Sequence, residues 1–125
     1  MEETGDPAVL LIEDYSDILA TWEECLRARG FRHTIFMVKN GEDALDVWTR
    51  FQTRIHVVAL DGHIEGSLDE CEIARRIRAE RDDIPIIACS DQVERNFELR
   101  RAGCSHTDVK EHVPQLIERL MRRAV

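Results

Sequence analysis

Long apolar runs are missing from the sequence, and so is a basic, apolar opening. The longest apolar runs are AVLLI at residues 8–12 and IPIIAC at residues 84–89, whereas a transmembrane helix needs about 20 apolar residues. The acidic opening MEETGD lacks the features of a secretory signal peptide. We therefore expect a cytoplasmic protein without a membrane-spanning segment.

The common cysteine and histidine motifs are also missing. The four cysteines lie far apart with no CxxC pair, at Cys25, Cys71, Cys89 and Cys104. This spacing argues against zinc and redox motifs and favours reduced, mostly buried thiols. None of the five histidines has a second histidine four residues away, so no helix is predicted to present a histidine pair to a metal.

Positive charge is scarce relative to negative charge. Lysine and arginine total 17 against 25 aspartates and glutamates, which gives a net charge of −8. Because such a field repels nucleic-acid phosphates and anionic lipids, we expect no direct binding to nucleic acid or to a membrane. With 125 residues, 43% hydrophobic and 34% charged, and no linker or repeat, the chain is predicted to form one soluble domain over residues 1–125.

Short apolar runs of the length of buried strands recur along the chain. They lie at residues 8–13, 33–38, 55–60, 85–89 and 106–109. Stretches with helical periodicity separate them, which is typical of a parallel sheet that is covered on both faces. Right-handed crossovers then give an open, doubly wound α/β fold with its site at the carboxyl ends of the strands.

Helix boundaries can be predicted from capping residues. The first helix is expected to start near Asp17, with Ser16 as its cap, and to end at Gly30. The turn Asn40–Gly41 opens the second helix. The last helix places its apolar residues within 113–121 on one face.

The third and fourth helices are expected between the last three strands. The third carries Cys71, Ile73, Ala74 and Ile77 on one side. The fourth segment, residues 92–102, has only a thin apolar stripe, which we predict to be Val93, Phe97 and Ala102.

Polar side chains follow the strands at the edge where their carboxyl ends meet. Glu13 and Asp14 end the first strand, Asp61 the third and Ser90 the fourth, and Lys110 follows the fifth. Crowded carboxylates repel one another in a partly desolvated cleft unless a cation lies among them. Mg²⁺ prefers such oxygen ligands and often binds a phosphate as well, for which a lysine and a hydroxyl are suitable partners.

The segments VLLIED (9–14), VVALDG (57–62), PIIACS (85–90) and GCSHTDVK (103–110) resemble the signature segments of response-regulator receiver domains. The resemblance extends over essentially the whole chain. It implies a flavodoxin-like, doubly wound, five-stranded parallel sheet of order 2-1-3-4-5. It also implies a signalling domain of a two-component system, which is a phosphoacceptor that helps catalyse its own phosphorylation and dephosphorylation rather than an enzyme with its own substrate.

The resemblance assigns a role to each residue at the strand ends. Glu13, Asp14, Asp61 and the backbone carbonyl of His63 would hold Mg²⁺. Asp61 would accept the phosphoryl group, Lys110 and Ser90 would bind its oxygens, and Ser90 with Thr107 would occupy the switch positions. The implied partners are a sensor histidine kinase or phosphotransfer protein, and a downstream protein at the face of the fourth helix, fifth strand and last helix. A homodimer is a further possibility.

The sequence departs from the family pattern at several of these positions. Ile64 and Glu65 replace the usual Met-Pro, and Asp69 replaces the glycine that opens the third helix. Lys110 is followed by Glu111 rather than a cis proline, and we expect a trans bond because a non-proline cis bond costs ~3 to 4 kcal/mol.

Two more departures affect access to the acceptor and the conformational switch. Asp91 adds a carboxylate after the switch hydroxyl, which would hinder or slow phosphoryl transfer. Thr107 replaces the aromatic residue whose rotation usually follows the hydroxyl, so the usual coupling between the two cannot operate.

Three other functions are alternatives to this one. A degenerate receiver would act as a phosphorylation-independent interaction or dimerisation module, as Asp91, Thr107 and Glu111 suggest. An aspartate-nucleophile phosphatase would need a second aspartate as acid and base, where this chain has His63. A flavin site is disfavoured because the loop EDYSDI has no glycine-rich or threonine-rich phosphate cradle.

Overall fold

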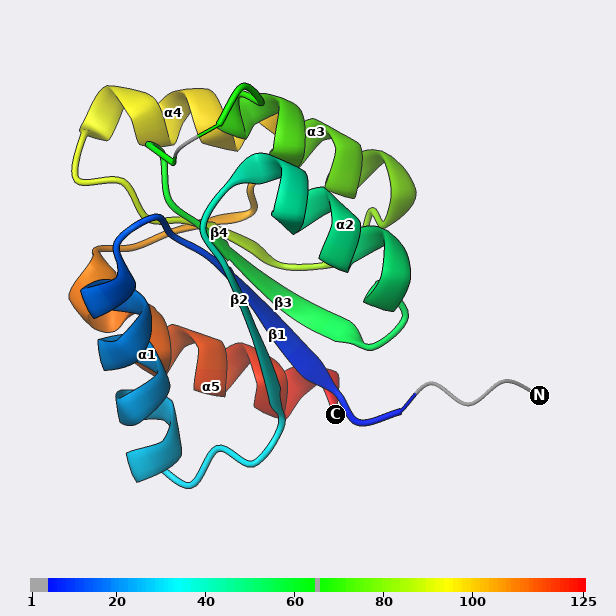
Figure 1. Ribbon diagram of the computed structural model, residues 1–125, viewed down its shortest axis with the longest axis vertical. Helices are drawn as coiled ribbons and strands as arrows, with labels where there is room; N and C mark the ends of the chain where they lie inside the picture. Colours follow the sequence, from blue (N-terminus) through cyan, green and yellow to red (C-terminus); the bar gives the residue numbers. More distant parts are fainter. Residues whose placement is uncertain (1–4, 65) are drawn as a thin grey trace.

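The computed structural model describes residues 5–64 and 66–125 as strands that alternate with helices (Figure 1). The strands are β1 Ala8–Ile12, β2 Thr34–Val38, β3 Ile55–Leu60, β4 Ile86–Ala88 and β5 His106–Thr107. The α-helices are α1 Ser16–Ala28, α2 Gly41–Phe51, α3 Glu70–Glu80, α4 Val93–Ala102 and α5 Val113–Ala124, and a 3₁₀ helix covers Lys110–His112.

All five strands form one parallel sheet in the order β2-β1-β3-β4-β5. This flavodoxin-like order confirms the fold that the sequence predicts. Strand β1 pairs with β2 on one side and with β3 on the other, so Ile12 lies beside both Val38 and Leu60. The residues that follow β1 and β3 therefore leave the sheet side by side.

A hydrophobic core lies on each face of the sheet, because successive strand residues point to opposite sides. Leu10 and Ile12 of β1 join the cluster under α2, α3 and α4, which includes Trp48 and Ile77. Val9 and Leu11 join the other cluster, under α1 and α5, which includes Trp22, Leu26 and Ile117. Figure 1 shows the two layers of helices on either side of the strands.

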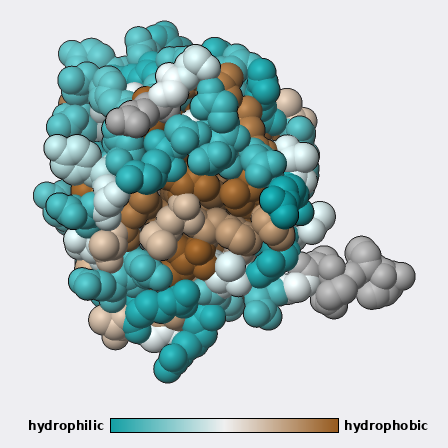
Figure 2. All heavy atoms as spheres, in the orientation of Figure 1, coloured by the Kyte–Doolittle hydropathy of each residue, from teal (hydrophilic) through white to brown (hydrophobic). Residues whose placement is uncertain are grey.

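The edge strand β2 is less covered than the strands beside it. Its residues are mostly half-buried, and Met37 is 40% exposed. Figure 2 shows apolar surface at the centre of the view, where Figure 1 draws the strands, between two belts of hydrophilic helical surface. Within the described ranges, no helix is both long enough and apolar enough to cross a membrane.

The structure tests three of the predicted helix ends, and the predicted cap at Ser16 was wrong. Asn40 caps α2, because its side chain accepts a hydrogen bond from the Asp43 N–H at 2.8 Å. Ser16 is not the cap of α1, because the helix begins at Ser16 itself with Tyr15 as the N-cap residue. The Ser16 hydroxyl accepts instead from Lys39 Nζ at 2.6 Å. Gly30 ends α1 as predicted, with a positive φ of 88°.

The predicted apolar stripe of α4 was wrong in part. Val93 and Phe97 are 66% and 65% exposed, whereas Ala102 is buried together with Leu99. Positions 95, 99 and 102 lie on the face of the helix that points inward. The inward face therefore contains Arg95, whereas the predicted apolar stripe contained Phe97. This face cannot be recognised as buried from the sequence, because its first residue, Arg95, is charged.

The thiols and tryptophans largely follow the sequence prediction. Cys71, Cys89 and Cys104 are buried and Cys25 is exposed, and all four are free. Trp22 and Trp48 lie in the core.

Two truncations in α4 test which of its apolar residues are in the core. We expect Leu99→Ala to lower the free energy of unfolding by about 2 to 5 kcal/mol, because it leaves a cavity in the core. Phe97→Ala should change it by less than about 0.5 kcal/mol, because the ring is exposed. Urea denaturation of both variants makes the comparison, and a large loss in Phe97→Ala would show that the ring is buried.

Candidate functional site

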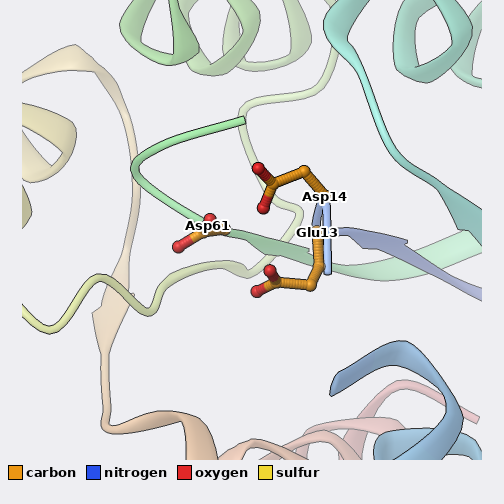
Figure 3. A group of neighbouring side chains, drawn as sticks. All are labelled: Glu13, Asp14 and Asp61. Carbon is orange, nitrogen blue, oxygen red and sulfur yellow. The ribbon is translucent and has the colours of Figure 1, made fainter. Parts of the chain in front are cut away.

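Three carboxylates converge where β1 and β3 end. Glu13 and Asp14 follow β1 and Asp61 follows β3, and one oxygen from each lies within 4.8 Å of the others. Figure 3 shows the three carboxylates directed toward a common space. The sheet holds their backbones, because the Glu13 N–H donates to the Val38 carbonyl at 3.1 Å and the Asp61 N–H to the Ile12 carbonyl at 3.0 Å.

Two of these carboxylates are buried, which makes their negative charge costly. Glu13 is 1% and Asp61 is 4% exposed. Burial raises the pKa of Glu13, and the nearby charge of Asp61 raises it further. Burial also raises the pKa of Asp61, although Lys110 and the His63 N–H act in the opposite direction. The site therefore favours a positively charged partner.

Lys110 supplies one positive charge to this site. Its Nζ lies 3.0 Å from Glu13 Oε1 and 3.2 Å from Asp61 Oδ1. Burial lowers the pKa of Lys110, but the two carboxylates outweigh it and hold that pKa above its usual value. The ammonium therefore stays charged and partly offsets the carboxylates.

Lys110 reaches the carboxylates without the cis proline of the family pattern. The described residues contain no cis peptide bond, which confirms the predicted trans bond before Glu111. The residue opens the 3₁₀ helix after β5, and its carbonyl accepts a hydrogen bond from the Trp22 indole at 2.9 Å. Helix α1 thus holds the backbone from which the Lys110 side chain extends to the carboxylates.

Ser90 lies at the end of β4, beside the residue that follows Asp61. A Cβ atom added to Gly62 would lie only 2.8 Å from Ser90 Cβ. The Ser90 hydroxyl accepts a hydrogen bond from the Gln92 N–H at 3.1 Å. The structure thus brings together the acidic residues, Lys110 and Ser90 that the sequence singles out.

Comparisons with known proteins identify the family and the fold. The model of the family described as response regulator receiver domain matches residues 9–120. The chain belongs to this family. No curated protein matches the chain in sequence.

Solved receiver domains share the fold. This receiver domain is 25% identical to the signal receiver domain of a modulated diguanylate cyclase from Desulfovibrio desulfuricans G20, covering 96% of this chain and 94% of that one, with a TM-score of 0.74. A response regulator receiver domain protein from Clostridium thermocellum is 18% identical over 94% and 96% of the two chains, with a TM-score of 0.78. The BeF3-activated DrrB receiver domain is 21% identical over 94% and 99%, with a TM-score of 0.75.

The carboxylates of this receiver domain have the chemistry of a divalent cation site. Glu13 Oε1 is buried and, among the described residues, has no partner in hydrogen-bond geometry, although Lys110 lies within ion-pair distance. A buried carboxylate oxygen without a hydrogen bond is costly, and an oxygen-binding cation would stabilise it. The residues present therefore fit Mg²⁺, which prefers carboxylate oxygens.

The side chains at the two remaining predicted positions pair with other residues. The His63 imidazole pairs with the Gln92 side chain at 3.2 Å, and the role of its backbone carbonyl stays a prediction. Thr107 is exposed, and its hydroxyl accepts from Arg100 Nη1 at 3.4 Å. Thr107 lines a groove of about 820 Å³ together with Ser90, Lys110, Trp22 and Val93.

The loop that follows Asp61 contains a supporting group that the sequence alone did not indicate. Asp69 caps α3 by accepting from the Cys71 N–H at 2.8 Å, which explains why it can replace a glycine there. Glu70 is buried and accepts from the Ile64 N–H at 2.7 Å. Both carboxylates also pair with Arg95 of α4. Only the tertiary contact between α3 and α4 identifies this group.

The Ile64–Glu65 departure lies partly outside the described residues, since residue 65 is not among them.

Neutralising Asp61 should stabilise the domain when no divalent cation is present. Because the pKa of Asp61 in the folded state is raised above its ordinary value of 3.8, the folded state binds the proton more tightly. The free energy of unfolding therefore falls as the pH rises from 3.8 through the higher pKa of the folded state, and the loss persists at pH 7. We expect Asp61→Asn to gain on the order of 1 kcal/mol at pH 7 in EDTA, with a smaller gain as the pH approaches 4.

Urea denaturation at several pH values measures this gain. Asp82→Asn is the matched control, because Asp82 is exposed and lies away from the three carboxylates. Lower stability of Asp61→Asn in EDTA at pH 7 would contradict the prediction.

Proposed function

We propose that this receiver domain accepts a phosphoryl group on Asp61 from a sensor histidine kinase or a phosphotransfer protein, in a step that depends on Mg²⁺. The observation that carries the proposal is the convergence of Glu13, Asp14, Asp61 and Lys110 at one edge of the sheet. Glu13, Asp14, Asp61 and the His63 carbonyl would hold the ion.

The residues of the chain have distinct tasks in this reaction. A carboxylate oxygen of Asp61 attacks the phosphorus in line, a new P–O bond forms, and the bond from phosphorus to the donor nitrogen breaks. The Lys110 ammonium, 3.2 Å from Asp61 Oδ1, would bind the phosphoryl oxygens, and the Ser90 hydroxyl would donate to one of them. When bound, Mg²⁺ supplies positive charge that offsets the charge of the transferring group.

The domain acts in this proposal as a stoichiometric acceptor and not as an enzyme with its own substrate. It would assist its own phosphorylation and dephosphorylation through the same residues. Because the donor phosphohistidine is made from ATP, we propose that the domain works in the cytoplasm.

A downstream protein is proposed to bind the face formed by α4, β5 and α5. Exposed Val93 and Phe97 provide apolar area on α4. The face also carries exposed arginines that make it locally basic, namely Arg100, Arg101, Arg119, Arg122 and Arg123. The same face could join two copies in a homodimer.

A phosphorylation-independent interaction module is the second candidate. Lys110 already pairs with both Glu13 and Asp61, so part of the negative charge is offset without any ion. The exposed Asp91 and the absence of an aromatic residue at Thr107 point the same way. The phosphorylation experiment below separates the two functions.

Incubation with acetyl phosphate and Mg²⁺ should add one phosphoryl group to the wild-type chain, as intact mass spectrometry would show. Asp61→Asn should gain none, and EDTA should prevent the gain in wild type. Lys110→Ala should react about 100-fold more slowly, because it removes a cation that stabilises the transferring group. Asp82→Asn should react like wild type.

An adduct on Asp61→Asn that matches the wild-type adduct would rule out Asp61 as the acceptor. Wild type without any adduct, from acetyl phosphate and from a partner kinase alike, would favour the interaction module.

A further inference from the structure

Arg95 is a largely buried cation that connects α4 to the loop after Asp61. Its side chain is 15% exposed. Its Nε donates to the Gly62 carbonyl at 3.0 Å, and its Nη2 donates to Asp69 at 2.9 Å and to Glu70. Its Nη1 donates to Glu98 of its own helix at 2.8 Å. A planar guanidinium can make all of these bonds at once, which a lysine ammonium cannot.

These bonds fix the loop at two points. The Gly62 carbonyl belongs to the residue directly after Asp61, and Glu70 links Arg95 to the Ile64 N–H, which donates to the other Glu70 oxygen at 2.7 Å. Residues 62–64 are therefore attached to α4 through one side chain. Since Glu70 is buried, the ion pair is protected from water and holds its geometry.

The next residue of α4 holds the second loop of the site. Asn96 Oδ1 accepts from the Ser90 N–H at 3.0 Å, and Asn96 Nδ2 donates to the Ser90 carbonyl at 2.9 Å. A Cβ atom at Gly62 would lie 2.7 Å from Arg95 Cγ and 2.8 Å from Ser90 Cβ. Gly62 is thus packed closely against Arg95 and Ser90.

A phosphoryl group on Asp61 must disturb this packing. The His63 N–H lies close enough to the Asp61 carboxylate to lower its pKa, and conversion of one carboxylate oxygen into an acyl phosphate adds charged oxygens beside Gly62. The usual path to the output face is absent, because Thr107 is not aromatic and its hydroxyl pairs with Arg100. Close packing passes a displacement of Gly62 on to Arg95.

We propose that Arg95 is a positioning residue that couples the phosphoryl state of Asp61 to helix α4, so that phosphorylation shifts the first turns of α4 and the exposed Val93 and Phe97. This inference rests on the proposed phosphoacceptor function. It adds a residue and a route to that function, from the Gly62 carbonyl through the guanidinium to the helix.

The test is an NMR titration with Mg²⁺ and beryllofluoride, a mimic of the acyl phosphate. Bound fluoride is followed by ¹⁹F spectra, and the backbone amides of residues 93–97 by ¹⁵N spectra. Wild type should bind the mimic and show shifted amides in α4. Arg95→Gln should bind the mimic but lose the α4 shifts. Arg75→Gln is the matched control, because Arg75 is an exposed arginine of the neighbouring helix α3, and it should behave like wild type.

Each outcome has a separate meaning. Wild type that does not bind the mimic overturns the phosphoacceptor function, and the inference with it. Wild type that binds without α4 shifts, or Arg95→Gln that binds with full α4 shifts, overturns the inference alone. Loss of binding in folded Arg95→Gln would make Arg95 part of the binding site and would also overturn it.

A second variant decides the matter if Arg95→Gln does not fold, as judged by circular dichroism. Arg95→Lys keeps the charge beside Glu70 but cannot hold Gly62 and both carboxylates together. It should bind the mimic with reduced α4 shifts. Full wild-type shifts in Arg95→Lys would overturn the inference.

Discussion

Repulsion between buried carboxylates at one edge of the sheet is the constraint on which the site depends. Parallel pairing of β1 with β3 makes Glu13 and Asp61 neighbours, and burial removes the water that would screen them. A single lysine offsets part of this charge. The remaining excess of negative charge favours a cation among the carboxylates, which is the basis of the proposed function. Burial of these charges also costs the domain stability.

The surroundings of Asp61 are held mainly by polar bonds, in contrast to the rest of the domain. The sheet and its two apolar clusters fix β1 and β3 rigidly. Beyond the strand ends, however, the loops are fixed by Arg95, Glu70 and Asn96, whose partners are backbone groups of the loops. Hydrogen bonds are directional and exchange partners more readily than a packed core does. The domain therefore combines a rigid sheet with loops, at the carboxyl ends of its strands, whose hydrogen bonds can be exchanged.

The fold and the four strand-end positions could be predicted from the sequence because they follow from local patterns. Apolar runs mark strands, and parallel strands carry their polar ends to a common edge, so the positions of Asp61 and Ser90 follow without any contact information. The inward face of α4 could not be predicted in this way. Arg95 is buried only because acidic residues from α3 surround it, and no local pattern reports a partner some 25 residues away, as Glu70 is.

For Lys110, too, the sequence predicts the residue but not its position in the folded structure. Its identity and its place after β5 follow from the sequence, but the geometry that brings its ammonium to the carboxylates depends on a 3₁₀ helix and on Trp22. The Asp69 cap is similar, since a glycine replaced by aspartate has meaning only once the start of α3 is known.

The bond from the Trp22 indole to the Lys110 carbonyl gives the domain a built-in optical reporter. Indole emission responds to its hydrogen bonding, so light from Trp22 should register movement of the lysine segment. The second indole, Trp48, bonds to Glu80 in the opposite layer, so a variant that keeps only Trp22 would isolate this signal. An optical record of events around Asp61 would then need no added label.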